Sequence, residues 1–272
     1  MTLAGIPFRG VSIAGRETWF HVPSLDLALD VGRGPAEVVP VPNLLLSHAH
    51  LDHAGGLAYW ASQRRLLRLA RARVLTEPEA VPAWKAILEL HGGLEGVSYD
   101  VDVEPLAPGG TADLRRDLSV TAFRADHRVP SLGFVASEVR RRLVPEWRGR
   151  PEAEIREAIA RGETVTRPSP RPLLAFSGDS GAGLFESAPR EAFEAKVFLL
   201  ECSFVADEDR PRARRFGHLH LDDVAERAEA FANEALVLTH LTLRSTPEEL
   251  RRAIARRLPA SLASRTVPFL PA

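Results

Sequence analysis

The sequence predicts an α/β fold, and the alternation of short apolar runs with helical stretches carries that prediction. Four apolar runs have the length of buried strands, at 44–46, 173–176, 197–200 and 236–239. Helical patterns lie between and after them, at 57–71, 78–91, 151–161, 221–232 and 247–258. The 272 residues are enough for one domain with a large core, and no Pro- or Ser-rich linker, repeat or low-complexity tract divides them. We therefore expect 1–272 to form a single domain.

Composition excludes several classes of protein. The 35 basic and 36 acidic residues give a net charge of −1, so any affinity for nucleic acid must come from local patches. Cys202 is the single cysteine, which excludes an internal disulfide and a Cys-rich zinc site. No apolar stretch approaches the length of a membrane span, and the N-terminus lacks the pattern of a secretory signal. We therefore expect a cytoplasmic protein with no membrane partner.

The segment 47–53, Ser-His-Ala-His-Leu-Asp-His, directly follows the apolar run 44–46. It places His48, His50, Asp52 and His53 on the loop that leaves a predicted strand, where functional groups commonly gather. Neutral imidazole and carboxylate suit divalent metals, and zinc above all. A single histidine here would be an ordinary loop residue, but three histidines and a carboxylate together favour a metal site. The apolar side of the helix expected at 57–71 would be Leu66, Leu67, Leu69 and Ala70.

The pattern His-x-His-x-Asp-His followed by glycine resembles the metallo-β-lactamase superfamily of metal-dependent hydrolases. In that superfamily a lone His, an Asp and a final His follow later strands, and His127, Asp179 and His240 stand in that order, each after an apolar run. The resemblance implies one metal held by His48, His50 and His127, and a second held by Asp52, His53 and His240, with Asp179 bridging them. It also implies an αββα four-layer sandwich with this dimetal site at the edge between the two sheets. The pattern alone would permit other α/β folds. Two Zn²⁺ ions are expected, although Mn²⁺ and Fe suit the same ligands.

Four further stretches are more specific: 129–134 after His127, 201–204 (Glu-Cys-Ser-Phe), 217–220 (Gly-His-Leu-His) and 239–244 around His240. Together they resemble the tRNase Z (ribonuclease Z) family in its short, plant-type form, over nearly the whole chain. The resemblance implies an endonuclease that trims the 3′ trailer from precursor tRNA, usually as a homodimer. It implies that Asp52 assists the attacking water and that His218, oriented by Glu201, protonates the leaving oxygen. His220, two residues away, is a competing candidate for the acid.

The chain departs from the family in a few places. Ser180 stands where Thr is commoner, and Leu241 stands where an aromatic residue is usual. The interval between His127 and Asp179 has no long Gly/Pro-rich tract, so we expect the flexible arm of the bacterial-type enzymes to be absent.

Three arginines are candidate contacts to the RNA substrate. Arg141 and Arg148 lie in a basic insert at about 138–171, and Arg244 lies beside His240. Trp147 in the insert is a candidate for stacking on a base. Five glutamates dilute the charge of the insert, which favours the alternative of a solvated charged hairpin.

Other catalytic signatures are absent from the sequence: it contains no Gly-x-Ser-x-Gly elbow, P-loop or complete dinucleotide fingerprint. A phosphodiesterase or other hydrolase of the same fold, acting on a small substrate, is the alternative function. A di-iron redox protein of the same fold is the least favoured hypothesis. Those proteins usually carry Glu at the position of His50, together with a flavin domain for which this chain has no room.

Overall fold

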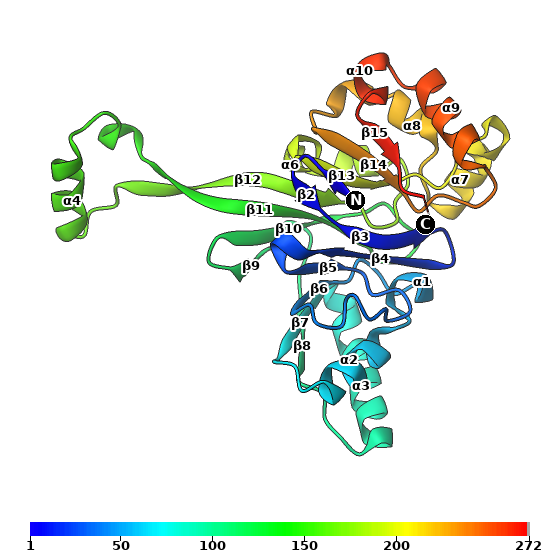
Figure 1. Cartoon of the computed structure of the whole chain (residues 1–272), viewed down its shortest axis with the longest axis horizontal. Helices are drawn as coiled ribbons and strands as arrows, with labels where there is room; N and C mark the ends of the chain where they lie inside the picture. The colour runs from blue at the N-terminus through cyan, green and yellow to red at the C-terminus, as the bar shows by residue number, and fades with distance from the viewer. Residues whose placement is uncertain (271–272) are drawn as a thin grey trace.

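Two large β-sheets face each other and carry helices on their outer sides (Figure 1). The computed structural model describes residues 1–270, so the last two residues of the expected domain lie outside the described part. Within residues 1–270, no helix combines the length and the apolar character needed to cross a membrane.

The N-terminal half of the chain builds the six-stranded sheet, with the order β3-β4-β5-β6-β7-β8. These strands are β3 (Arg9–Ile13), β4 (Glu17–Val22), β5 (Leu27–Leu29), β6 (Asn43–Leu45), β7 (Ala72–Thr76) and β8 (Val101–Pro105). From β5 to β8 the strands are parallel, so their carboxyl ends lie at one edge of the sheet. A separate hairpin pairs β1 (Thr2–Leu3) with β2 (Ile6–Pro7).

The rest of the chain builds the seven-stranded sheet, with the order β15-β14-β13-β12-β11-β10-β9. Its strands are β9 (Thr111–Arg115), β10 (Leu118–Arg124), β11 (Leu132–Leu143), β12 (Thr166–Phe176), β13 (Val197–Glu201), β14 (Ala235–Thr239) and β15 (Thr266–Pro268). The strands from β12 to β15 are parallel, and those from β9 to β12 are antiparallel. The apolar runs predicted from the sequence all fall on strands, at β6, β12, β13 and β14.

Helices cover the outer face of each sheet. Helices α2 (Leu57–Leu66) and α3 (Val81–Glu95) cover the six-stranded sheet, and α1 (Leu51–Ala54) lies at its edge. On the side of the seven-stranded sheet lie α5 (Leu184–Ser187), α6 (Arg190–Glu194), α7 (Arg210–Phe216), α8 (Leu221–Ala225), α9 (Pro247–Arg257) and α10 (Ala260–Ala263). The order helix, sheet, sheet, helix confirms the predicted αββα sandwich.

The alternation of side chains along the strands explains this layering. On β13, Val197 and Leu199 belong to the core between the two sheets, whereas Phe198 and Leu200 belong to the core under the helices. Phe20 and Phe176 meet edge to face between the sheets, with ring centroids 5.9 Å apart. Each fully buried side chain of this size contributes roughly 1.5–3 kcal/mol, and these contacts fix the two sheets relative to each other.

Two predicted helices are shorter than expected. The helix predicted at 57–71 ends at Leu66, and its predicted apolar face is wrong because Leu66 and Leu67 are exposed. The buried face includes Arg64, whose guanidinium donates to the carbonyls of Val39, Val41 and Ala70 and so ties the helix to the loop before β6. The helix predicted at 221–232 ends at Ala225.

A two-stranded ribbon extends from the body of the molecule and carries helix α4 (Glu152–Ala160) at its far end (Figure 1). The ribbon consists of the outer parts of β11 and β12, paired as far as Leu143 and Thr166. The expected absence of an arm is therefore wrong: an arm is present, although it is not rich in glycine. Prolines at 168, 170 and 172 leave three alternate positions of β12 without a backbone N–H donor. Since β12 still pairs with β11, the missing donors lie on its outer edge, which protects that edge from pairing with another chain.

Candidate metal centre and active site

The seven predicted metal ligands come from four strand ends and meet at one edge of the two sheets. His48 and His50 lie on the loop after β6, and Asp52 and His53 lie on α1 directly after it. His127 follows β10, Asp179 follows β12 and His240 follows β14. The structure therefore brings together all seven residues, although the first and the last lie nearly 200 positions apart in the sequence.

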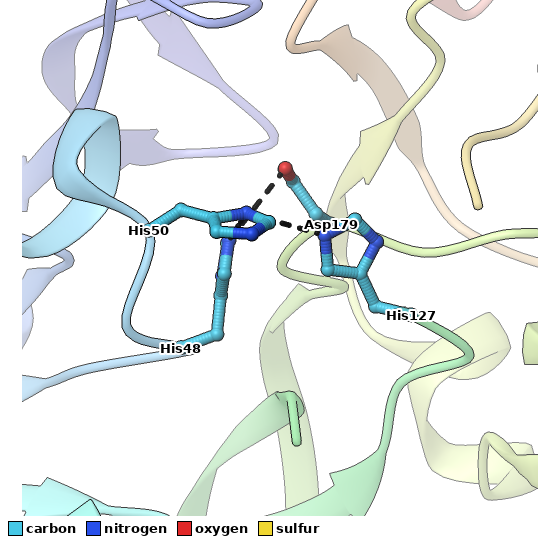
Figure 2. A group of neighbouring side chains, drawn as sticks. All are labelled: His48, His50, His127 and Asp179. Carbon is cyan, nitrogen blue, oxygen red and sulfur yellow. Dashed lines mark hydrogen bonds and ion pairs between the residues drawn. The ribbon is translucent and has the colours of Figure 1, made fainter. Parts of the chain in front are cut away.

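In the first group, Nε2 of His48 lies 3.0 Å from Nδ1 of His50, and Nε2 of His127 lies 3.4 Å from the same nitrogen. The Oδ2 atom of Asp179 lies 3.7 Å from Nε2 of His48. Figure 2 shows these three rings and the carboxylate facing a common point. Ligands about 2.1 Å from a tetrahedral metal lie about 3.4 Å from one another, so these separations fit a bound cation.

The second group joins Asp52, His53 and His240. Nε2 of His240 lies 3.5 Å from Oδ2 of Asp52 and 3.3 Å from Oδ2 of Asp179, and Nε2 of His53 lies 3.3 Å from Oδ1 of Asp179. Within residues 1–270, neither Nε2 atom has a hydrogen-bond partner of good geometry, although both are buried. Two buried nitrogens aimed at carboxylates without a proper hydrogen bond fit a divalent metal. The donors in both groups are therefore chemically suited to divalent cations.

The protonation states of the first group's histidines and of the two carboxylates favour the same interpretation. Burial lowers the pKa of His48 well below its ordinary value and also lowers the pKa of His50 and His127, so these rings are neutral and have a lone pair free for a metal. Burial alone would raise the pKa of the Asp179 carboxyl, but His240 and His53 hold it well below its usual range. Burial likewise opposes ionisation of Asp52, yet His240 and His53 lower its pKa to about 2. Both carboxylates are therefore ionised at neutral pH.

Asp30 is a residue of the candidate site that the sequence analysis missed. It is fully buried after β5, where its Oδ2 lies 2.6 Å from Nδ1 of His53. The same carboxylate accepts hydrogen bonds from the backbone N–H and the hydroxyl of Ser47, and that hydroxyl lies 3.0 Å from Nδ1 of His48. Asp30 thus orients one histidine of each group. The signal was present, because Asp30 follows the apolar run 27–29 as the other ligands follow theirs.

Glu201, at the end of β13, supports the half of the site that belongs to the seven-stranded sheet, as Asp30 supports the other half. Its carboxylate accepts hydrogen bonds from Ser203 N–H, the Ser203 hydroxyl and Leu219 N–H, and the Ser203 hydroxyl lies 2.9 Å from Nδ1 of His240. Nδ1 of His218 lies 3.2 Å from Oε1 of Glu201, at an angle outside that of a good hydrogen bond. Burial would lower the pKa of His218, but contact with Glu201 raises it. Glu201 therefore contacts the predicted acid and supports a predicted ligand.

The structure separates the two candidates for the acid. The ring of His218 stacks on that of His240 at 5.2 Å between centroids and lies equally close to the ring of His127. The ring of His220 is instead buried as the N-cap of α8, where Nδ1 accepts from Asp222 N–H and Nε2 donates to the Ala206 carbonyl. With both ring nitrogens engaged, His220 is a structural residue.

Tight backbone geometry brings Asp179 and His240 into place. Gly178 has a φ of +60°, and a Cβ added there would lie 2.7 Å from the carbonyl oxygen of Leu132 and 3.0 Å from Cβ of Ser47. Only glycine permits this approach between the two halves. His240 itself has a φ of +57°, and its N–H donates to the hydroxyl of Ser12 on β3. Such strained positions in non-glycine residues cluster at functional sites.

The three arginines predicted to contact substrate lie away from the histidine cluster. Arg141 is on the ribbon and donates to the hydroxyl of Thr166 across it, and Arg148 follows the 3₁₀ turn Pro145–Trp147 near its tip. Arg244 lies 3.6 Å from a carboxylate oxygen of Asp209 and lines a different cavity, together with Glu249. None of the three contacts the predicted ligands.

Comparison with known proteins identifies the family. The Beta-lactamase superfamily domain model matches residues 23–241. The chain is 31% identical to tRNase Z TRZ1 of Arabidopsis thaliana over 267 residues, which cover 97% of this chain and 95% of that protein. It is 30% identical to the chloroplastic tRNase Z TRZ2 of the same plant, over 98% of this chain and 76% of that protein. The chain belongs to the tRNase Z family of the β-lactamase superfamily.

Solved structures agree with this fold. The short form of human tRNase Z superposes with a TM-score of 0.64 at 16% identity, covering 97% of this chain and 95% of that one. The metallo-β-lactamase fold protein YhfI from Bacillus subtilis superposes with a TM-score of 0.62 at 14% identity, and each chain is 97% covered. At these identities the likeness establishes the fold alone.

The substitution Asp30→Asn tests the role of this buried carboxylate. The change keeps the shape but replaces one acceptor oxygen with a donor next to the ring of His53. We expect affinity for Zn²⁺ to fall roughly 10–100-fold, measured by competition with a chromogenic chelator, while the protein stays folded in a thermal melt. Asp102→Asn is the control, because Asp102 pairs only with Arg71 on the surface. Wild-type affinity in Asp30→Asn would show that Asp30 does not support the site.

Proposed function

We propose that the protein is a metal-dependent endoribonuclease that removes the 3′ trailer from precursor tRNA. The single observation that carries this proposal is the position of His218, held by Glu201 against the rings of both predicted ligand groups, in a chain of the tRNase Z family. A phosphodiester cleaved at this site would have cations on one side and a proton donor on the other. That is the arrangement such a hydrolysis requires.

Two divalent cations, which we propose to be zinc, would supply positive charge that stabilises the negative charge growing on the phosphoryl oxygens. Asp52 remains ionised because of its low pKa, so it can orient the attacking water by accepting a hydrogen bond from it. His218 faces Glu201 through Nδ1, which leaves Nε2 to give its proton to the leaving oxygen. The proton donor and the water-orienting carboxylate thus belong to different halves of the fold.

The insert 138–171 supports an RNA substrate. It contains nine arginines and six glutamates and so has a net charge of +3. Several of these arginines are paired with glutamates, such as Arg140 with Glu138 and Arg156 with Glu152. Within residues 1–270, five form no ion pair and remain available to phosphates: Arg141, Arg142, Arg148, Arg167 and Arg171. The ring of Trp147 lies under the guanidinium of Arg150, 4.9 Å from centroid to carbon, near the tip of the arm.

A homodimer is part of the proposal. Ile87, Leu90 and Leu94 form an exposed apolar stripe along α3, with spacings of three and four residues that place them on one face. Exposed stripes of this kind commonly mark protein interfaces. We propose this stripe as the contact between two copies, and a monomer mass from light scattering would reject it. We also propose a cytoplasmic location for the protein.

Incubation of the purified protein with Zn²⁺ or Mn²⁺ and a precursor tRNA tests the function directly. We expect a single cut near the 3′ end of the acceptor stem, detected by gel electrophoresis, and loss of that cut after chelation. A bis-aryl phosphodiester is assayed in parallel. Turnover of the small ester without any cut in the precursor would favour a small-molecule phosphodiesterase instead.

Substitution of His218 by Ala tests the acid. Because a positioned general acid typically contributes 10²–10⁴-fold, we expect kcat for precursor tRNA to fall by roughly that factor, with metal content unchanged. His220→Ala is the matched control: it removes a helix cap and should lower stability by about 1 kcal/mol with little effect on kcat. Full activity in His218→Ala would reject the assignment.

Charge reversal on the arm, Arg141→Glu with Arg148→Glu, tests its contact with RNA. We expect KM for precursor tRNA to rise, because phosphate contacts are lost, while turnover of a bis-aryl phosphodiester stays unchanged. Arg252→Glu on α9 is the control for a charge reversal elsewhere on the surface. An unchanged KM in the double variant would show that the arm is a solvated hairpin.

A further inference from the structure

A cavity of about 490 Å³ opens beside His218, and the function proposed above does not explain it. One wall is the segment after β10, with Arg128 and Val129, and another is the end of α7, with Arg212 and Phe216. His50, His127, His218 and His240 also line the cavity. We call this space the acid-side cavity. Its size falls within the usual range for a ligand pocket, roughly 300–1,000 Å³.

The acid-side cavity is electrostatically suited to an anion. Arg128 and Arg212 are exposed, and within residues 1–270 neither forms an ion pair or a hydrogen bond. None of the described residues that line the cavity is acidic. The cavity beside Arg244 differs, because Asp207, Glu208 and Glu249 line it together with its arginines. Free guanidinium groups therefore concentrate next to the proposed acid.

The arginine wall is fixed to the catalytic cluster. Gly217, which ends α7 with a φ of +71°, lies so close to Arg128 that a Cβ added there would be 3.3 Å from Cγ of Arg128. The carbonyl of Gly217 lies 2.9 Å from Nδ1 of His127, so the same residue also contacts a predicted metal ligand. The two walls therefore keep a fixed position relative to the histidines.

An aromatic ring lies within this wall. The guanidinium of Arg212 is 5.5 Å from the centroid of the half-buried Phe216 ring, and that of Arg215 is 5.6 Å from it. A ring beside free guanidinium groups is the combination that proteins use for nucleotides, because the base stacks while a phosphate pairs with arginine. Neither the stacking nor the pairing with phosphate depends on the identity of the base.

We propose that Arg128, Arg212 and Phe216 form the binding subsite for the nucleotide that carries the leaving oxygen. This inference rests on the proposed function. A general acid must lie within hydrogen-bond reach of the oxygen that it protonates, so the nucleotide attached to that oxygen must enter the cavity beside His218. The two arginines bind the phosphate on the side of this nucleotide away from the scissile bond, and Phe216 stacks on its base. Asp52 lines a neighbouring cavity, which shares His50 with the acid-side cavity, so water and leaving group can approach from opposite sides of that histidine.

The test uses Arg128→Ala with Arg212→Ala, and Phe216→Leu, in the metal-loaded enzyme. We expect kcat/KM for precursor tRNA to fall roughly tenfold or more in each variant, a clearly larger loss than for a bis-aryl phosphodiester, which has no second phosphate, with the melting temperature unchanged. Arg214→Ala is the control, because Arg214 is on the same helix but does not line the cavity. Wild-type kcat/KM for precursor tRNA, or an equal loss with the small ester, would overturn the subsite.

A second measurement separates this inference from the proposed function. Nucleoside 5′- and 3′-monophosphates are tested as inhibitors of bis-aryl phosphodiester turnover, with inorganic phosphate for comparison. We expect a nucleotide to inhibit the wild type more strongly than phosphate does, and this advantage to be lost in both sets of variants but kept in Arg214→Ala. If the wild type shows this pattern without cutting precursor tRNA, the proposed function fails and the subsite stands. If no nucleotide is preferred to phosphate, the subsite fails whatever the RNA assay shows.

Discussion

The carboxylate of Asp179 is the point at which the two halves of the molecule meet. His48 and His53 approach it from the six-stranded sheet, and His240 approaches it from the seven-stranded sheet, at separations of 3.3–3.7 Å. A buried carboxylate without compensating charge would cost several kcal/mol. His240 and His53, one from each sheet, hold the pKa of Asp179 low, so this compensation exists only when the sheet edges are held together, which the apolar core between the sheets achieves.

Each half supports its share of the cluster with a second buried carboxylate. Asp30, after β5, fixes Ser47 and His53, and Glu201, at the end of β13, fixes Ser203 and the loop at Leu219. Both carboxylates are buried and accept backbone and hydroxyl hydrogen bonds, so they hold the loops that carry the histidines in place. Hydrogen bonds within each half therefore make the site rigid, and bonds such as that from His240 N–H to Ser12 join the two halves beside the cluster.

Sequence alone could predict most of the cluster because its chemistry is local to strand ends. The histidines at 48, 50 and 53 are close in sequence, and the later ligands each follow an apolar run. Asp30 obeys the same rule, but an aspartate after a strand is also a common turn residue, and only the pairing of β5 with β6 places it against His53. The sequence also indicated a charged insert, yet the length of the ribbon depends on pairing between β11 and β12. For α2, the local sequence pattern predicted that Leu66 and Leu67 are buried. The carbonyls that accept hydrogen bonds from Arg64 instead determine which face of the helix is buried.

The distribution of charge explains why RNA recognition would be confined to a few parts of the protein surface. The insert carries +3 in a chain of net charge −1, so the remaining residues carry about −4, which two bound divalent cations would balance. An RNA would be attracted only where arginines are unpaired, which in the described residues includes the arm and the acid-side cavity. Two such points, one far from the body and one beside His218, would fix the orientation as well as the position of a bound RNA. On this argument, the proposed acid would meet only a strand whose distant part is already held.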